Sequence, residues 1–213
     1  LADWQALPQP TTADYIDLSV IHERRSDLSA AIEAAQMAHT EAPNNERIAE
    51  RLLDLLVKDE RHTEALALVR QQERVWRWLE REGDILAAMG NDTLATARYG
   101  LVLAQLEQFA DTMRPDYLKA LQARVLLARA HAYRRLEQIE TARTLYQAAQ
   151  HILPDDPAIG FNLGVLAAIE GQHTEALTMC QAALQQGSPQ LQDEMRRSLD
   201  GDMALMWLAK ALA

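Results

Sequence analysis

Few side chains in this sequence have the types and the spacing that catalysis or metal binding needs. The six histidines are scattered, and no two of them stand four residues apart around a glutamate, so the helical zinc-protease motif is absent. The single cysteine, Cys180, cannot build a thiolate zinc site, and its apolar helical surroundings favour a small buried side chain over a nucleophile. The eight glycines form no phosphate-binding loop. We therefore expect no catalytic residue, no metal site and no cofactor in this segment.

Charged residues at helical spacing favour binding over catalysis. A series of five residues returns thirty positions later in the chain: Arg47, Glu50, Arg51, Asp54 and Leu56 recur as Arg77, Glu80, Arg81, Asp84 and Leu86. Steps of three and four residues place such side chains on one face of a helix. Two interpretations are open. Arginine forks and carboxylates could bind the charged groups of a peptide, or the charges could neutralise one another within a helix and between neighbouring helices.

The composition indicates that helices position these side chains. The 213 residues include only 8 glycines and 7 prolines, and 5% are aromatic, so residues that interrupt helices and residues that favour strands are both scarce. A hydrophobic fraction of 48% is ample for a buried core. The net charge of −10 disfavours a nucleic-acid partner, and no uncharged apolar run approaches the roughly 20 residues that span a bilayer. We expect a soluble, all-α chain without disulfides, in the cytoplasm or in the periplasm.

Internal repeats indicate how the helices are arranged. The pentapeptide HTEAL occurs twice, beginning at His62 and at His173, and each copy follows a polar turn and opens an apolar helical pattern. Small residues recur at a constant distance, as from Ala142 to Ala176, which are 34 residues apart. A 34-residue period of two helices is typical of a solenoid of stacked helical hairpins.

The repeated segments resemble the tetratricopeptide repeat family. The family places small residues where the two helices of a repeat cross closely. The segment 157–190 has Gly164, Ala176 and Ala183 at these positions, with Cys180 at the large position between them. The segment before it carries Ala130, Tyr133, Ala142, Tyr146, Ala149 and Pro154 at the matching places. The resemblance implies a right-handed superhelical solenoid of antiparallel helix pairs, with an extra C-terminal helix.

The repeat register divides the chain into a lead, five repeats and a C-terminal segment. Two prolines predict an irregular lead over residues 1–11. The repeats and one insertion are expected at residues 12–45, 46–75, 76–109, 110–122 (the insertion), 123–156 and 157–190. One step of the register is four residues short, which predicts a tight connection or merged helices after Val69. Another step is thirteen residues longer than the 34-residue period. It predicts a long helix from about Pro115 to Leu136, which either only packs or also contacts a partner.

The C-terminal segment, residues 191–213, is expected to form one or two capping or docking helices. Residues 203–213 are apolar nearly all round, whereas the terminal helix of a solenoid should have a polar outer face. Three explanations are open: the helix folds back onto its own chain, it docks on a partner or a second copy of the chain, or more protein follows. Trp207 is therefore a candidate interface residue, and so is Trp78.

The resemblance also implies a function in protein–protein interaction. In the family, the first helix of each repeat lines a concave groove, and positions 2, 5, 9 and 12 point into it. On this chain those positions give the candidate partner-binding residues Arg47, Glu50, Asp54, Arg77, Glu80, Asp84, Arg124, Leu127, His131, Arg134 and Phe161. We expect a non-catalytic scaffold that binds a peptide or a partner domain, without nucleic acid and without membrane insertion. The alternative is a repeat segment of a larger bacterial-type enzyme or of a secretion or assembly protein, which packs on its own chain or mediates oligomerisation.

Overall fold

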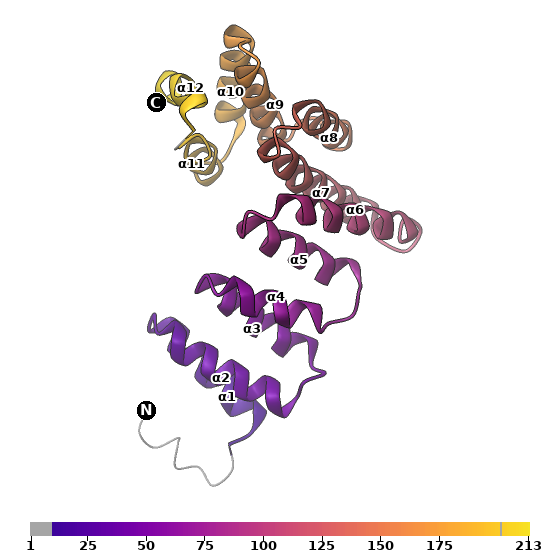
Figure 1. The fold of residues 1–213 in the computed structure, drawn as a ribbon, viewed down its shortest axis with the longest axis vertical. Helices are drawn as coiled ribbons and strands as arrows, with labels where there is room; N and C mark the ends of the chain where they lie inside the picture. Colours follow the sequence, from indigo (N-terminus) through magenta and orange to yellow (C-terminus); the bar gives the residue numbers. More distant parts are fainter. Residues whose placement is uncertain (1–9, 201) are drawn as a thin grey trace. The chain divides into compact units, whose positions relative to one another are not determined.

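Helices account for the regular structure of the described residues. The computed structural model describes residues 10–200 and 202–213, and no strand occurs in these ranges. Most of the expected irregular lead, residues 1–9, lies outside the described residues. The chain is all-α (Figure 1). Its elements are α1 (Thr12–Arg24), α2 (Leu28–Glu41), α3 (Glu46–Lys58), α4 (His62–Arg70), α5 (Trp76–Ala88), α6 (Asp92–Gln108), α7 (Pro115–Arg135), α8 (Ile139–Ile152), α9 (Pro157–Ile169), α10 (His173–Gln186), α11 (Pro189–Arg197), η2 (Met203–Leu205) and α12 (Met206–Leu212).

The helices form two compact units that divide between Arg74 and Val75. The first unit contains α1 to α4, and the second contains α5 to α12. The division falls at the short step of the repeat register. Here α4 ends after only nine residues, and residues 71–75 connect it to α5, so the two helices do not merge. A shortened second helix accounts for the four residues missing from the period.

The turns within the pairs α1–α2, α3–α4, α5–α6, α7–α8 and α9–α10 share one backbone conformation. In each turn, the residue after the C-cap of the first helix has a positive φ. The next backbone N–H bonds to a carbonyl oxygen five residues earlier, which satisfies an unpaired group at the helix end. The positive-φ residues are Ser26, Glu60, Gly90, Glu137 and Gly171. They are 34, 30, 47 and 34 residues apart, the same steps that separate the small residues of the sequence.

Two glycines of the second unit lie where the helices of a pair cross closely. A Cβ atom at Gly164 on α9 would lie 2.6 Å from Cys180 Sγ on α10. A Cβ atom at Gly83 on α5 would lie 2.7 Å from Cε1 of Tyr99 on α6. Contacts this short leave no room for a side chain, so both glycines set how closely the backbones approach.

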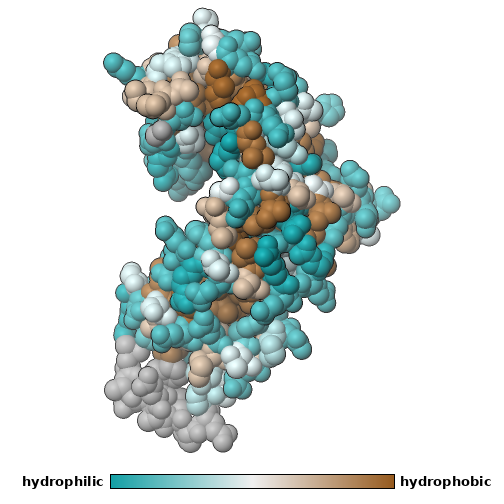
Figure 2. All heavy atoms as spheres, viewed as in Figure 1, coloured by the Kyte–Doolittle hydropathy of each residue, from teal (hydrophilic) through white to brown (hydrophobic). Residues whose placement is uncertain are grey.

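Two hydrophobic clusters hold the second unit together. The first joins α7, α8 and α9 through buried residues that include Ala130, Tyr146 and Leu166. The second joins α9 and α10 to the C-terminal elements, with Phe161 packed in the same cluster as Leu208 of α12. On the surface, Figure 2 shows one face of the molecule, where hydrophobic residues lie exposed between hydrophilic ones.

The C-terminal elements pack against their own chain and still expose apolar side chains. Met195, Leu205 and Leu212 are buried in the second cluster. On the other side of the same elements, the residue Met203 is 85% exposed and Met206 is 63% exposed. The apolar side chains of this segment therefore fall into two groups, one buried against the chain and one exposed to solvent. Among the described helices, none is long and apolar enough to cross a membrane.

Candidate binding surface

In the first unit, α3 carries the three candidate residues. Arg47 and Asp54 are exposed and Glu50 is half-buried, on the face of α3 opposite its buried leucines. Their neighbour Arg51 pairs with Glu23 on α1, which also accepts a hydrogen bond of 2.9 Å from a lysine at the end of α3. These two cations lower the pKa of Glu23, the lysine more than Arg51. Charges on neighbouring first helices thus neutralise one another here.

In the second unit, two of the candidate residues pair with each other. Arg124 on α7 donates from Nε and Nη2 to the two carboxylate oxygens of Glu80 on α5, at 2.9 and 2.8 Å. The residue Glu80 is only 9% exposed, whereas the side chain of Arg124 is 64% exposed. Burial raises the pKa of Glu80, and the charge of Arg124 opposes that rise. The guanidinium is therefore held in a fixed position at the surface.

The other α5 candidates lie beside this pair. Asp84 accepts a hydrogen bond of 2.8 Å from the hydroxyl of Tyr99 on α6. Arg77 is exposed, and its guanidinium lies 5.8 Å from the ring centroid of Trp76. Trp78, an expected interface candidate, is buried and belongs to the core. The partly exposed tryptophan of α5 is its neighbour Trp76.

On α7, the candidates Leu127, His131 and Arg134 are all half-buried. The ring of His131 packs edge-on against the ring of Tyr146, with centroids 5.6 Å apart. Burial, aided by the nearby arginines Arg134 and Arg135, lowers the pKa of His131 to about 4, so this imidazole is neutral at pH 7. Arg134 Nε and the Tyr146 hydroxyl are both buried without a hydrogen-bond partner.

The last two candidates are not open surface residues. Phe161 is 1% exposed, because the C-terminal elements cover its position on α9. Trp207 is half-buried, and its ring meets that of His173 edge-on, with centroids 4.3 Å apart. Phe161 therefore offers no open apolar surface to a partner in the expected groove.

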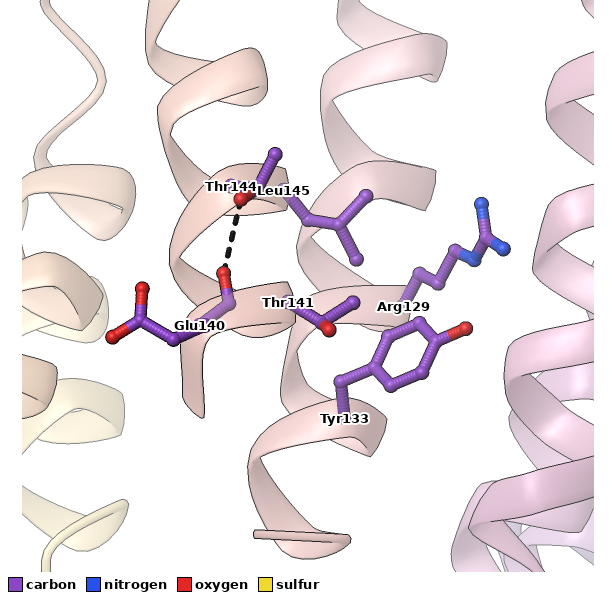
Figure 3. Close-up of a pocket in the computed structure, with 6 residues that line it drawn as sticks. All are labelled: Arg129, Tyr133, Glu140, Thr141, Thr144 and Leu145. Carbon is purple, nitrogen blue, oxygen red and sulfur yellow. Dashed lines mark hydrogen bonds between the residues drawn. The ribbon is translucent and has the colours of Figure 1, made fainter. Parts of the chain in front are cut away.

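Ion pairs and a cavity on the second unit were not anticipated from the sequence. Three pairs join different helices: Arg98 with Glu82, Arg135 with Asp92, and Arg143 with Glu170. Their partners are 16 to 43 residues apart in the chain, beyond the reach of a helical-spacing pattern. The cavity lies between α7 and α8 and has a volume of about 300 Å³. It is lined by Arg129, Tyr133, Glu140, Thr141, Thr144 and Leu145 (Figure 3).

The described residues offer little to a metal ion or a nucleophilic reaction. No group of three or more histidine, cysteine or carboxylate side chains there could hold a metal ion. Cys180 is fully buried, and burial raises the pKa of its thiol to about 12. A thiol that stays protonated and out of reach of solvent is a packing group.

Comparison with known proteins supports the fold and only the fold. No family model and no curated protein matches the chain. Among solved structures, residues 41 to the end of MamA from Desulfovibrio magneticus RS-1 match with a TM-score of 0.65 and 18% identity, over 92% of this chain and 100% of that one. TTC0263, described as a thermophilic TPR protein in Thermus thermophilus, matches with a TM-score of 0.56 and 18% identity, over 88% of this chain and 96% of that one.

A further match is YrrB, described as a TPR protein with an unusual peptide-binding site. Its TM-score is 0.51 and its identity 14%, over 87% of this chain and 91% of that one. The helix pairs, their shared turns and the glycines at the crossings agree with these likenesses. The chain has the tetratricopeptide repeat fold.

Proposed function

We propose that the chain is a non-catalytic scaffold that binds a peptide or a partner domain on the face that α5 and α7 share in the second unit. The Glu80–Arg124 pair is the observation that carries this proposal. The buried carboxylate occupies two N–H groups of the guanidinium and fixes its orientation. The remaining N–H groups of this exposed side chain are available to a ligand.

The surroundings of Arg124 favour an acidic peptide with an apolar side chain beside its acidic group. Arg77 adds an exposed positive charge on α5, and the half-buried Leu127 adds an apolar contact on α7. His131 is neutral at pH 7 and adds a ring rather than a charge. Because stacked helices hold these groups in place, binding loses little ordering entropy. The peptide-binding site named for YrrB, which shares the fold, supports a peptide as the ligand.

The test is a comparison of the partners captured by three versions of the chain. The groove variant combines Arg77→Gln, Glu80→Gln and Arg124→Gln. It removes both members of the buried pair, so that no buried charge is left alone. The control, Arg114→Gln, removes one charge from an exposed position just before α7.

We expect the groove variant to retain less than a tenth of the partner that wild type captures from native lysate, as quantified by mass spectrometry. The control should retain it fully. Circular dichroism of all three proteins checks that the fold is intact. Equal capture by a folded groove variant would refute this face as the binding site.

A second function, self-association through the C-terminal elements, is favoured by one observation. Met203 of η2 and Met206 of α12 are largely exposed, although both elements also pack against their own chain. Exposed apolar patches of this kind mark interaction sites. The double variant Met203→Ser with Met206→Ser should shift the chain towards monomer in light scattering over a concentration series. A monomeric wild type at the highest concentration would exclude this function.

A further inference from the structure

We propose that the cavity between α7 and α8 is a second binding site, which takes a carboxylate group of an acidic peptide. The residues that line it belong to none of the predicted groove positions, so the inference goes beyond the proposed function. Figure 3 shows Arg129 and Tyr133 of α7 side by side, with Thr141 and Leu145 of α8 facing them. The cavity thus joins one cation, an aromatic ring, hydroxyl groups and an apolar side chain.

Arg129 is the arginine of α7 that lines the cavity, and in the described part of the chain it has no counter-charge. Arg124 pairs with Glu80, and Arg135 pairs with Asp92. Among the described residues, no carboxylate pairs with Arg129, and its Nε is buried without a hydrogen-bond partner. A guanidinium that is partly removed from water and has no acceptor gains more from an incoming carboxylate than a solvated or paired one.

The guanidinium of Arg129 is held in position by two contacts. It lies 5.6 Å from the ring centroid of Tyr133, in a cation–π contact. It also lies against Gly100 of α6, where a Cβ atom would come within 3.2 Å of Nη2. A glycine inside a helix is about 1 kcal/mol less favourable than alanine. Here the missing side chain makes the room that the guanidinium occupies.

The other lining residues fit a carboxylate with an aliphatic neighbour. Thr144 Oγ1 already donates to the carbonyl oxygen of Glu140, at 3.0 Å. The hydroxyl of Thr141 has no hydrogen bond among the described residues, so it is available to donate to a ligand oxygen. Leu145 is half-buried and supplies an apolar contact. The Glu140 carboxylate points away from Arg129 in Figure 3 and does not neutralise it.

The helix that supplies Arg129 attracts anions although the chain as a whole is acidic. The sequence of α7 contains five basic residues and one acidic residue, whereas the chain has a net charge of −10. Two of the five, Arg124 and Arg135, are paired with carboxylates of other helices, so the basic residues of α7 that have no such partner within the described ranges supply the attraction for an acidic ligand.

The test titrates the ¹⁵N-labelled chain with three short peptides and follows the Nε–Hε resonance of Arg129 together with the backbone amide resonances of Thr141 and Leu145, which every variant retains. The probe is acetyl-Gly-Leu-Glu-Leu-Gly-amide. The second peptide has Gln in place of Glu, and the third is the Gln peptide with a free C-terminal carboxylate. We expect the Glu peptide to shift these resonances saturably and the Gln amide to bind at least tenfold more weakly. Binding of the third peptide would show that a C-terminal carboxylate is accepted as well as a side-chain one.

Three variants complete the test. Arg129→Gln should weaken binding of the Glu peptide at least tenfold. The control Arg114→Gln removes the same charge about 20 Å away along α7 and should leave binding unchanged. The groove variant of the preceding subsection should also bind the peptide normally, which separates this site from the proposed function. The proposal is overturned if neither carboxylate peptide binds wild type better than the Gln amide does. It is also overturned if the groove variant loses binding. The peptide comparison needs only wild type, so it decides even where a variant does not fold.

Discussion

Tyr99 and Tyr146 occupy equivalent positions of α6 and α8, and their hydroxyl groups have different surroundings. Tyr99 donates to Asp84, whereas Tyr146 has the ring of His131 at the equivalent place and no hydrogen-bond partner for its hydroxyl. Both side chains are buried. A buried hydroxyl that has lost its water without gaining a partner destabilises the folded state, whereas a paired one contributes to stability.

The two tyrosines therefore predict opposite effects of the same substitution. Tyr99→Phe should lower the free energy of unfolding by about 1.5–3 kcal/mol, because it removes a hydrogen bond to a carboxylate. Tyr146→Phe should leave it unchanged or raise it by up to about 1 kcal/mol, because the hydroxyl is buried without a partner. Urea unfolding followed by circular dichroism measures both. A loss for Tyr146→Phe as large as that for Tyr99→Phe would mean that the hydroxyl has a partner after all.

His131 predicts how the stability of the second unit depends on pH. Its pKa in the folded chain is about 4, below the ordinary value of 6.5. Between these two values the unfolded chain binds a proton at this site and the folded chain does not, so stability falls as the pH is lowered from 6.5 to 4. The loss is on the order of 2 kcal/mol, with allowance for the partial exposure of the ring. Urea midpoints at pH 7 and pH 4.5 measure it.

The variant His131→Gln is the control for this pH dependence. The raised pKa of Glu80 acts in the opposite direction, because the folded chain takes up that proton first as the pH falls. Glu80 titrates in both proteins, so the difference between wild type and the variant isolates His131. An equal loss of stability in the two proteins would show that His131 does not titrate as proposed.

At the scale of elements, the sequence predicts that helix pairs form better than it predicts where each helix ends or which side chains meet between helices. The all-α fold follows from scarce helix breakers and from small residues such as Ala142 and Ala176, because close helix crossings require small side chains. The sequence does not predict how short α4 is, because no glycine, asparagine or proline follows its end at Arg70. The candidate surface was less predictable. Glu80 is buried because Arg124 reaches it from 44 residues away, and no local pattern records that contact.

The hairpin turns give the prediction for this scale. Glu60 and Glu137 have φ values of 57° and 59°, where equivalent turns have Gly90 and Gly171. A residue with a Cβ atom is strained in this left-handed conformation, and glycine is not. Glu60→Gly and Glu137→Gly should therefore each raise the free energy of unfolding by about 0.5–1 kcal/mol. Urea unfolding of the single variants measures this gain.

A matched substitution tests the cause of that gain. Glu33 is an exposed residue in the middle of α2, and Glu33→Gly should destabilise the chain by about 1 kcal/mol. If Glu60→Gly and Glu137→Gly destabilised the chain as much as Glu33→Gly does, the two turns would carry no backbone strain for glycine to relieve.

At the scale of the whole molecule, the two units differ in the number of helix pairs that they stack. The second unit has three helix pairs, both hydrophobic clusters described above and C-terminal elements that cover Phe161. The first unit has two helix pairs, and its fourth helix is the shortened one. Repeat proteins gain stability from each neighbouring interface, and about three repeats are needed for an independent core. The second unit meets that requirement by itself.

This difference predicts how the chain behaves when it is divided between Arg74 and Val75. The fragment 75–213 should keep its helical circular dichroism signal and unfold cooperatively in urea, because both clusters and the Glu80–Arg124 pair lie within it. The fragment 1–74 should lose most of its helical signal, because two helix pairs bury too little apolar surface to offset the entropy of ordering. An unfolded 75–213 fragment would contradict the independence of the second unit. A stably folded 1–74 fragment would show instead that two pairs are sufficient in this chain.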